Sequence, residues 1–76
     1  MEREHQLKLV GEKIRSLREK LGVTQDQMAF KAGFSRSYYS GVERGVRNIS
    51  AVNLIQLAKA LDVEVGGLFP PTNELG

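Results

Sequence analysis

The residue types that carry most enzyme and metal chemistry are scarce in this sequence. Cysteine is absent, so the chain can form neither a thiolate nucleophile, nor a disulfide, nor a thiolate zinc site. The single histidine, His5, does not make a metal site by itself, and no nucleophile or orienting group is recognisable beside it. The carboxylates follow no spacing that acid–base catalysis would require. We therefore expect a binding protein rather than an enzyme, with no metal, cofactor or small-molecule ligand.

Positive charge is concentrated in the N-terminal portion of the chain. Residues 1–48 contain ten Lys and Arg against six Asp and Glu, whereas residues 49–76 contain one against three, within a net charge of +2. This asymmetry favours a polyanion as partner for one side of the protein. A solvated surface of mixed charge explains the same numbers, so charge alone leaves both interpretations open.

Chain length and hydropathy point to one small domain. We expect residues 1–76 to form a single domain with a core at about residues 7–69, because 76 residues leave no room for a second domain. No stretch approaches the roughly 20 apolar residues that a membrane helix needs. The first 20 residues alternate charges and contain no apolar signal segment. These features predict a soluble protein of the cytoplasm.

The apolar pattern predicts helices. A first helix carries one apolar stripe at steps of three and four, and Gly22 follows it as a stop signal. Three later segments each begin with a capping residue, Thr24, Ser35 or Ser50, and Gln27 completes a capping box with Thr24. No segment alternates with a period of two. The prediction is an all-α fold with five helices, at about residues 4–21, 25–32, 36–44, 51–61 and 65–69, and a frayed tail at 70–76.

The second and third of these helices are short and are joined by Ala32-Gly33-Phe34-Ser35. A turn of three or four residues that contains glycine is typical of a helix-turn-helix, and Gly33 adopts a positive φ at low cost. An ordinary helical hairpin is the alternative, but the combined spacing favours the DNA-binding motif. The apolar residues expected to face a shared core are Met28, Ala29, Ala32, Phe34, Tyr39 and Val42.

At these positions the chain resembles the Cro/C1-type (XRE) helix-turn-helix family, over about residues 7–69. The resemblance is carried by residues 18–22, by Thr24-Gln25, by residues 29–33 and above all by residues 36–50. The last run is similar to the controller proteins of restriction–modification systems. The resemblance implies a compact five-helix lambda-repressor-like domain whose third helix enters the major groove of double-stranded DNA.

The resemblance also implies roles for individual residues. Arg36 and Ser37 would reach base edges, since an arginine fork can take guanine O6 and N7 together. Gln25, at a helix N-terminus, and Arg47, in the loop after the recognition helix, would contact phosphates. The DNA-binding residues expected on this basis are Gln25, Arg36, Ser37, Tyr38, Ser40, Arg47 and Asn48.

Three positions keep a second interpretation. Tyr38 contacts the DNA backbone or is an ordinary exposed tyrosine. Asn48 contacts DNA or structures its loop through a side-chain hydrogen bond. Gly41 lies one turn after Ser37 on the same face, where family members often have a longer polar side chain; alternatively, its missing side chain leaves room for the backbone to approach DNA or another helix.

Two further features follow from the resemblance. Arg18 and Glu43 match a family ion pair that would hold the recognition helix against the first helix. The dimer surface would involve the C-terminal helical region, although these apolar residues would alternatively close the monomer core. The candidates for this surface are Val63, Val65, Leu68 and Phe69, with Leu61 or Ile55 as additions.

The function implied is that of a dimeric transcriptional regulator. A controller-like protein would bind a near-palindromic operator, autoregulate its own operon and, if it activates, contact RNA polymerase. An antitoxin or a phage-type repressor with the same fold is an alternative, as is a protein-interaction module without DNA binding. A membrane-surface helix is disfavoured, because Glu12 and Glu19 interrupt the basic face of the first helix.

Overall fold

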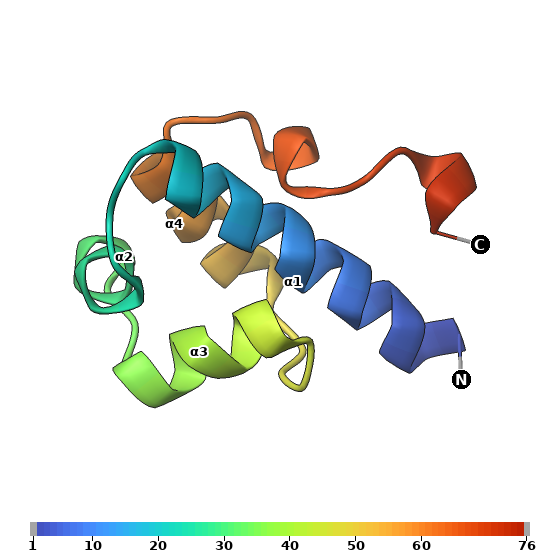
Figure 1. The fold of residues 1–76 in the computed structure, drawn as a ribbon, viewed down its shortest axis with the longest axis horizontal. Coiled ribbons are helices and arrows are strands. Elements are labelled where there is room, and N and C mark those ends of the chain that lie inside the picture. The colour runs from blue at the N-terminus through green and yellow to red at the C-terminus, as the bar shows by residue number, and fades with distance from the viewer. Residues whose placement is uncertain (1, 76) are drawn as a thin grey trace.

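The computed structural model describes residues 2–75, and every regular element in that range is helical (Figure 1). The α-helices α1 to α4 are followed by two short 3₁₀ turns, η1 and η2. In Figure 1, α1 lies across the other helices, and η2 returns to the side of the molecule where α1 begins. The bounds are Glu2–Lys20 for α1, Gln25–Ala32 for α2, Arg36–Arg44 for α3, Ala51–Leu61 for α4, Val65–Leu68 for η1 and Thr72–Glu74 for η2.

Local capping sets the starts of α2, α3 and α4. Thr24, Ser35 and Ser50 all have extended backbones, and each side-chain oxygen accepts a hydrogen bond from the backbone N–H three residues later. The expected capping box is present, because Gln27 Oε1 also accepts from the Thr24 N–H at 2.8 Å. Each cap satisfies an N–H that the helix itself leaves unbonded, and is worth about 1 kcal/mol. The start of each of these three helices is therefore specified locally.

Every major element contributes one large, fully buried side chain to a single core. These residues are Ile14, Met28, Tyr39, Leu57 and Leu68, from α1, α2, α3, α4 and η1 respectively. Burial of such side chains supplies about 1.5–3 kcal/mol each. The core expected around the helix-turn-helix is confirmed, with Phe34 half-buried against it, and comprises Met28, Ala29, Ala32, Tyr39 and Val42.

The predicted fifth helix is present in the C-terminal segment, but its type differs from the prediction. The fifth helix is a 3₁₀ turn, because it has only four residues and contains Gly66 and Gly67, which are poor helix formers. A frayed tail was predicted at residues 70–76, and the structure shows a 3₁₀ turn and a hydrogen bond to α1 in its described part. Residues Thr72–Glu74 form η2, and Gln6 Nε2 of α1 donates to the Leu75 carbonyl at 2.8 Å. Gly76 lies outside the described residues.

The absence of a side chain at Gly11 allows α1 to approach α3 closely. A Cβ at Gly11 would lie 2.6 Å from the Val42 carbonyl oxygen and would also meet the Glu43 backbone. Backbone atoms cannot move away as a flexible side chain can. The closeness of α1 and α3, on which the position of the recognition helix depends, therefore requires glycine here.

We expect Gly11→Ala to lower the free energy of unfolding by about 1–3 kcal/mol, because the added methyl group forces α1 and α3 apart. Urea unfolding at one fixed protein concentration measures this. Gly66→Ala is the control, since a Cβ there meets nothing within 4 Å, and its effect should stay within about 0.5 kcal/mol. If Gly11→Ala and Gly66→Ala changed the free energy of unfolding equally, the close approach of α1 to α3 would be contradicted.

Candidate nucleic-acid interface

A glycine turn joins α2 to α3 and sets the direction of α3. Gly33 has φ +80°, and its N–H is directed at the carbonyl groups of Ala29 and Phe30 at the end of α2. The Phe34 N–H donates to the Ala29 carbonyl at 2.8 Å, and Ser35 then caps α3. A left-handed residue followed by a new cap ends one helix and begins the next within three residues. The first turn of α3 therefore projects beside the first turn of α2.

The ion pair implied by the resemblance is present and buried. Arg18 Nε of α1 donates to Glu43 Oε2 of α3 at 2.7 Å, and Arg18 Nη2 donates to Oε1 at 3.2 Å. This two-point contact fixes both the position and the orientation of the carboxylate. It ties the C-terminal half of α3 to the long helix α1.

Three further hydrogen bonds surround the pair. Arg18 Nη1 donates to the Val23 carbonyl at 2.8 Å, Gln25 Nε2 donates to Glu43 Oε1 at 2.8 Å, and the Tyr39 hydroxyl donates to Glu43 Oε2. Within residues 2–75, no buried side-chain nitrogen or oxygen lacks a hydrogen-bond partner. One carboxylate thus connects α1, α2 and α3.

The same contacts keep the network in one charge state. Burial by itself raises the pKa of Glu43, but the hydrogen bonds from Arg18, Tyr39 and Gln25 outweigh it and hold that pKa below its ordinary value of 4.5. The hydrogen bond to Glu43 raises the pKa of Arg18. Burial, together with the same carboxylate, raises the pKa of Tyr39. Glu43 therefore remains an acceptor and its two partners remain donors at neutral pH.

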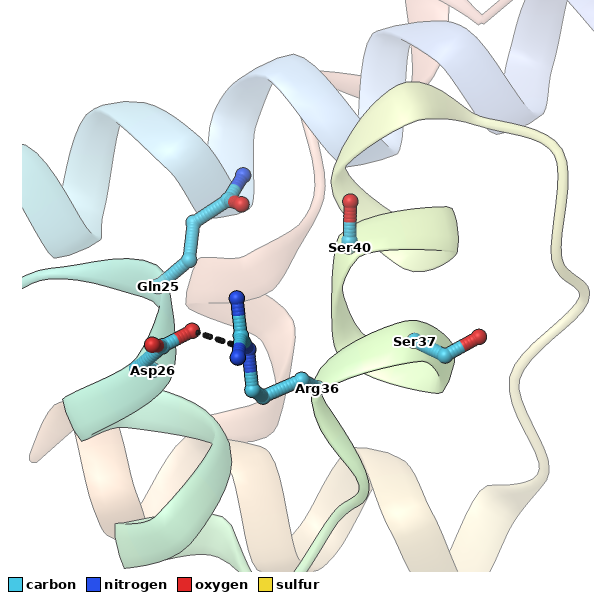
Figure 2. A pocket seen from close by; sticks show the side chains of 5 residues that line it. All are labelled: Gln25, Asp26, Arg36, Ser37 and Ser40. Atoms are coloured by element: carbon cyan, nitrogen blue, oxygen red, sulfur yellow. Dashed lines mark ion pairs between the residues drawn. The ribbon is translucent and has the colours of Figure 1, made fainter.

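The polar residues predicted at the starts of α2 and α3 line one open depression of about 390 Å³, which comprises Gln25, Asp26, Arg36, Ser37 and Ser40. Figure 2 shows Gln25 and Asp26 of α2 facing Arg36 across the turn, whereas the Ser37 hydroxyl points away from them. Gln25 uses one amide hydrogen for Glu43, which leaves its second N–H available. This depression brings together four of the seven predicted DNA-binding residues.

Tyr38 lies at the edge of this surface and is held by two contacts. Its ring packs edge-to-face on Phe34 with centroids 5.2 Å apart. Its hydroxyl oxygen accepts from Asn53 Nδ2 of α4 at 3.2 Å. Since the oxygen is the acceptor in that bond, the hydroxyl hydrogen stays available to a phosphate. Tyr38 is thus half-buried and positioned by α4, unlike an ordinary exposed tyrosine.

The loop after α3 folds back over Gly41. A Cβ at Gly41 would lie 2.5 Å from Arg47 Cγ, so the arginine stem occupies the space that a side chain would fill. The missing side chain of Gly41 therefore makes room for Arg47. From the sequence alone, that room was expected to serve DNA or another helix. Asn48 Oδ1 accepts from the Ile49 N–H at 3.0 Å, which agrees with its loop-structuring interpretation.

A second depression, of about 220 Å³, adds residues that the sequence analysis did not select. Lys8 and Arg15 of α1 line it together with Gln25 and with Arg44 at the end of α3. Arg15 also pairs with Glu19 at 3.2 Å. The seven-residue spacing of Lys8 and Arg15 places them on one face of α1. Only the packing of α1 on α3 shows that this face adjoins the predicted DNA surface.

The residues proposed for the dimer surface separate into three groups by exposure. Leu68 is fully buried in the monomer core, so its assignment to a subunit interface is wrong, and Leu61 is buried as well. Val63 and Phe69 are half-buried against the core. Val65 and Ile55 are exposed, at 38% and 45%.

Val52 belongs with the exposed group and was not selected from the sequence. It is 64% exposed and lies one turn before Ile55 on α4, so these two apolar side chains share a face.

Two short helices joined by a glycine turn, with a polar depression between their first turns, define a helix-turn-helix DNA-binding domain. The helix-turn-helix family matches residues 14–68. The chain belongs to the Cro/C1-type (XRE) helix-turn-helix family of transcriptional regulators. None of the helices in residues 2–75 is long and apolar enough to cross a membrane.

Similar proteins include controllers of restriction–modification systems. The crystal structure of the controller protein C.AhdI from Aeromonas hydrophila is 47% identical, with a TM-score of 0.84, over 87% of this chain and 96% of that one. The HTH-type transcriptional regulator y4dJ of Sinorhizobium fredii is 43% identical over 67 residues, which are 88% of this chain and 87% of that protein. The controller protein C.Esp1396I, solved as a tetramer in complex with its natural 35 base-pair operator, is 32% identical, with a TM-score of 0.75, over 91% and 87%.

We expect Glu43→Gln to lower the free energy of unfolding at neutral pH by about 3 kcal/mol, because it leaves the Arg18 charge buried without its counter-charge. Since the folded-state pKa of Glu43 is depressed, its contribution is complete above about pH 4.5 and disappears as pH falls through the folded-state pKa. The wild type should therefore lose more stability than the variant between neutral pH and about pH 3. Urea titrations across this range measure the difference. Glu74→Gln is the exposed control, and its stability should depend on pH as that of the wild type does. If the Glu43→Gln variant lost stability in acid as steeply as the wild type, the role assigned to Glu43 would be contradicted.

We expect Gly41→Ala to weaken DNA binding with little loss of stability. The added methyl group displaces the Arg47 stem from α3, while alanine favours the helix by about 0.5–1 kcal/mol. The loss in affinity should be about 1 kcal/mol, the size of one exposed charge contact. Fluorescence anisotropy with labelled duplex DNA measures it. If Gly41→Ala weakens binding by displacing Arg47, then adding Arg47→Ala to the Gly41→Ala variant should cause no further loss of affinity. Fully additive losses would show that the effect of Gly41→Ala does not act through Arg47.

Proposed function

We propose that the chain is a dimeric, sequence-specific regulator of transcription of the restriction–modification controller type. It would bind a near-palindromic operator in its own promoter region and autoregulate its operon. The observation that carries this proposal is the single depression that joins Gln25 of α2 to Arg36, Ser37 and Ser40 of α3. The role is one of binding alone, in the cytoplasm together with the DNA.

The polar residues divide naturally into two roles at the DNA. Arg36 and Ser37 stand at the start of α3, which is the part of a recognition helix that meets base edges. Gln25 has a remaining amide hydrogen beside the α2 N-terminus, and Tyr38 has a remaining hydroxyl hydrogen, so both suit phosphates. Arg47 lies in an exposed loop with its stem against Gly41, and its charged end suits contact with a phosphate.

Dimerisation would give the protein its operator spacing. The exposed apolar side chains of Val52 and Ile55 on α4, together with Val65, supply a surface that a second copy would cover. In a two-fold dimer the recognition helices stand roughly 34 Å apart and read half-sites about 10 base pairs apart. The operator-bound assembly of C.Esp1396I supports operator binding as an oligomer.

Occupancy of the operator would set the output. A bound dimer represses where it blocks the promoter, and it activates where it contacts RNA polymerase. An antitoxin or phage-type repressor would share the same DNA surface. Co-purification with the product of a neighbouring gene would favour the antitoxin over the controller.

The test is selection of binding sites from randomised duplex DNA at near-physiological salt. We expect enrichment of a two-fold symmetric site with half-sites about one helical turn apart. Arg36→Ala should cost about 1–3 kcal/mol per half-site and relax the base preference at one position. Arg47→Ala is the contrasting variant, because it should weaken binding to all sequences and reduce the salt slope by about one per lost contact. A folded protein that enriches no site, or an Arg36→Ala variant with unchanged base preference, would refute the assignment.

A further inference from the structure

Asp26 places a negative charge on the surface that the proposed function assigns to DNA. It lies in the first turn of α2, next to Gln25, and lines the same depression as Arg36 (Figure 2). A carboxylate in the first turn is stabilised by the helix dipole, but an acidic side chain at another first-turn position, facing away from the depression, would gain the same stabilisation without repelling phosphate. Its position on the DNA side therefore calls for a second reason.

That reason is the contact of Asp26 with Arg36. Arg36 Nε lies 2.8 Å from Asp26 Oδ1, across the turn between the two helices, and the side chains are 79% and 59% exposed. An ion pair this exposed adds little to folding stability, because water screens it and two side chains must be ordered. The consequence of this ion pair is instead to fix the position of the Arg36 guanidinium group.

The atom that Asp26 engages leaves the base-reading atoms free. The guanidinium group has one N–H on Nε and four on the two Nη nitrogens. Recognition of guanine uses two parallel N–H groups of the fork, directed at O6 and N7. With Nε facing Asp26, both Nη nitrogens remain available at the open side of the depression.

We propose that Asp26 is a specificity-determining positioning residue, which directs the Arg36 guanidinium towards a guanine edge and weakens binding to DNA that lacks this guanine. An arginine without a partner follows phosphates as readily as bases, whereas an arginine whose Nε side lies against a carboxylate presents its two Nη nitrogens in one direction. The negative charge of Asp26 also repels the phosphate backbone in general, which lowers the affinity for DNA of any sequence. This inference rests on the proposed function, in which Arg36 reads a base, and it gives Arg36 a partner residue in Asp26.

The experiment compares Asp26→Ala with the wild type on the selected operator, on single-base variants of it and on unrelated duplex DNA, by fluorescence anisotropy. We expect the preference for the chosen base at one position of each half-site to fall about two- to fivefold, the range of an exposed ion pair. The affinity for unrelated DNA should rise. In the Arg36→Ala background, Asp26→Ala should still raise that affinity and should no longer change any base preference.

Glu74→Ala is the matched control for charge. Glu74 is exposed in η2, at the opposite end of the molecule from α2 in Figure 1, so its loss removes one negative charge without touching Arg36. Thermal unfolding of each variant verifies that it is folded. An Asp26→Ala variant that binds all sequences more tightly, with the base preference of the wild type, would overturn the inference and leave the proposed function standing. A wild-type protein without sequence preference would instead overturn the proposed function, and this inference with it.

Discussion

The buried contact between Arg18 and Glu43 is the interaction on which the arrangement of the proposed DNA surface depends. Removing two charges from water is costly, and the cost is offset only when every lone pair and proton finds a partner. Here Glu43 accepts from three side chains, on α1, α2 and α3. Because one of these is Gln25, the network that positions the recognition helix also orients a residue of the predicted phosphate contact. Fold and DNA surface therefore share one set of hydrogen bonds.

A domain of this size leaves little room between its helices, and two glycines show how the space is used. At Gly11 the missing side chain lets the backbones of α1 and α3 approach, which brings Arg18 within reach of Glu43. At Gly41 the missing side chain lets the Arg47 stem lie on α3. Both arginines proposed to contact DNA are thus positioned within the monomer, Arg47 by this contact and Arg36 by Asp26. Such ordering before binding reduces the entropy lost when DNA is bound.

Helix boundaries were predictable because they depend on neighbours in the chain. The caps Thr24, Ser35 and Ser50 bond to N–H groups three residues away, so their effect is readable from the sequence. The helix-turn-helix followed from these caps and from Gly33. The type of the fifth helix also has a local cause, its glycine pair, whereas other features were decided where distant segments meet. Leu68 was a candidate for a subunit surface, with closure of the monomer core as the alternative, and it fills the core. The hydrogen bond from Gln6 to the Leu75 carbonyl likewise joins residues at opposite ends of the chain.

The candidate site shows the same division between local and long-range information. The sequence by itself determined the helices, the family and the identity of the polar residues on the recognition helix, because spacing and residue type encode these directly. Only the tertiary structure decided that Gln25 shares Glu43 with Arg18, that Lys8 and Arg15 adjoin the same surface, and that Asp26 faces Arg36. The physical reason is that these contacts join different helices, and their distances depend on how closely the helices pack, which no pattern along a single helix contains.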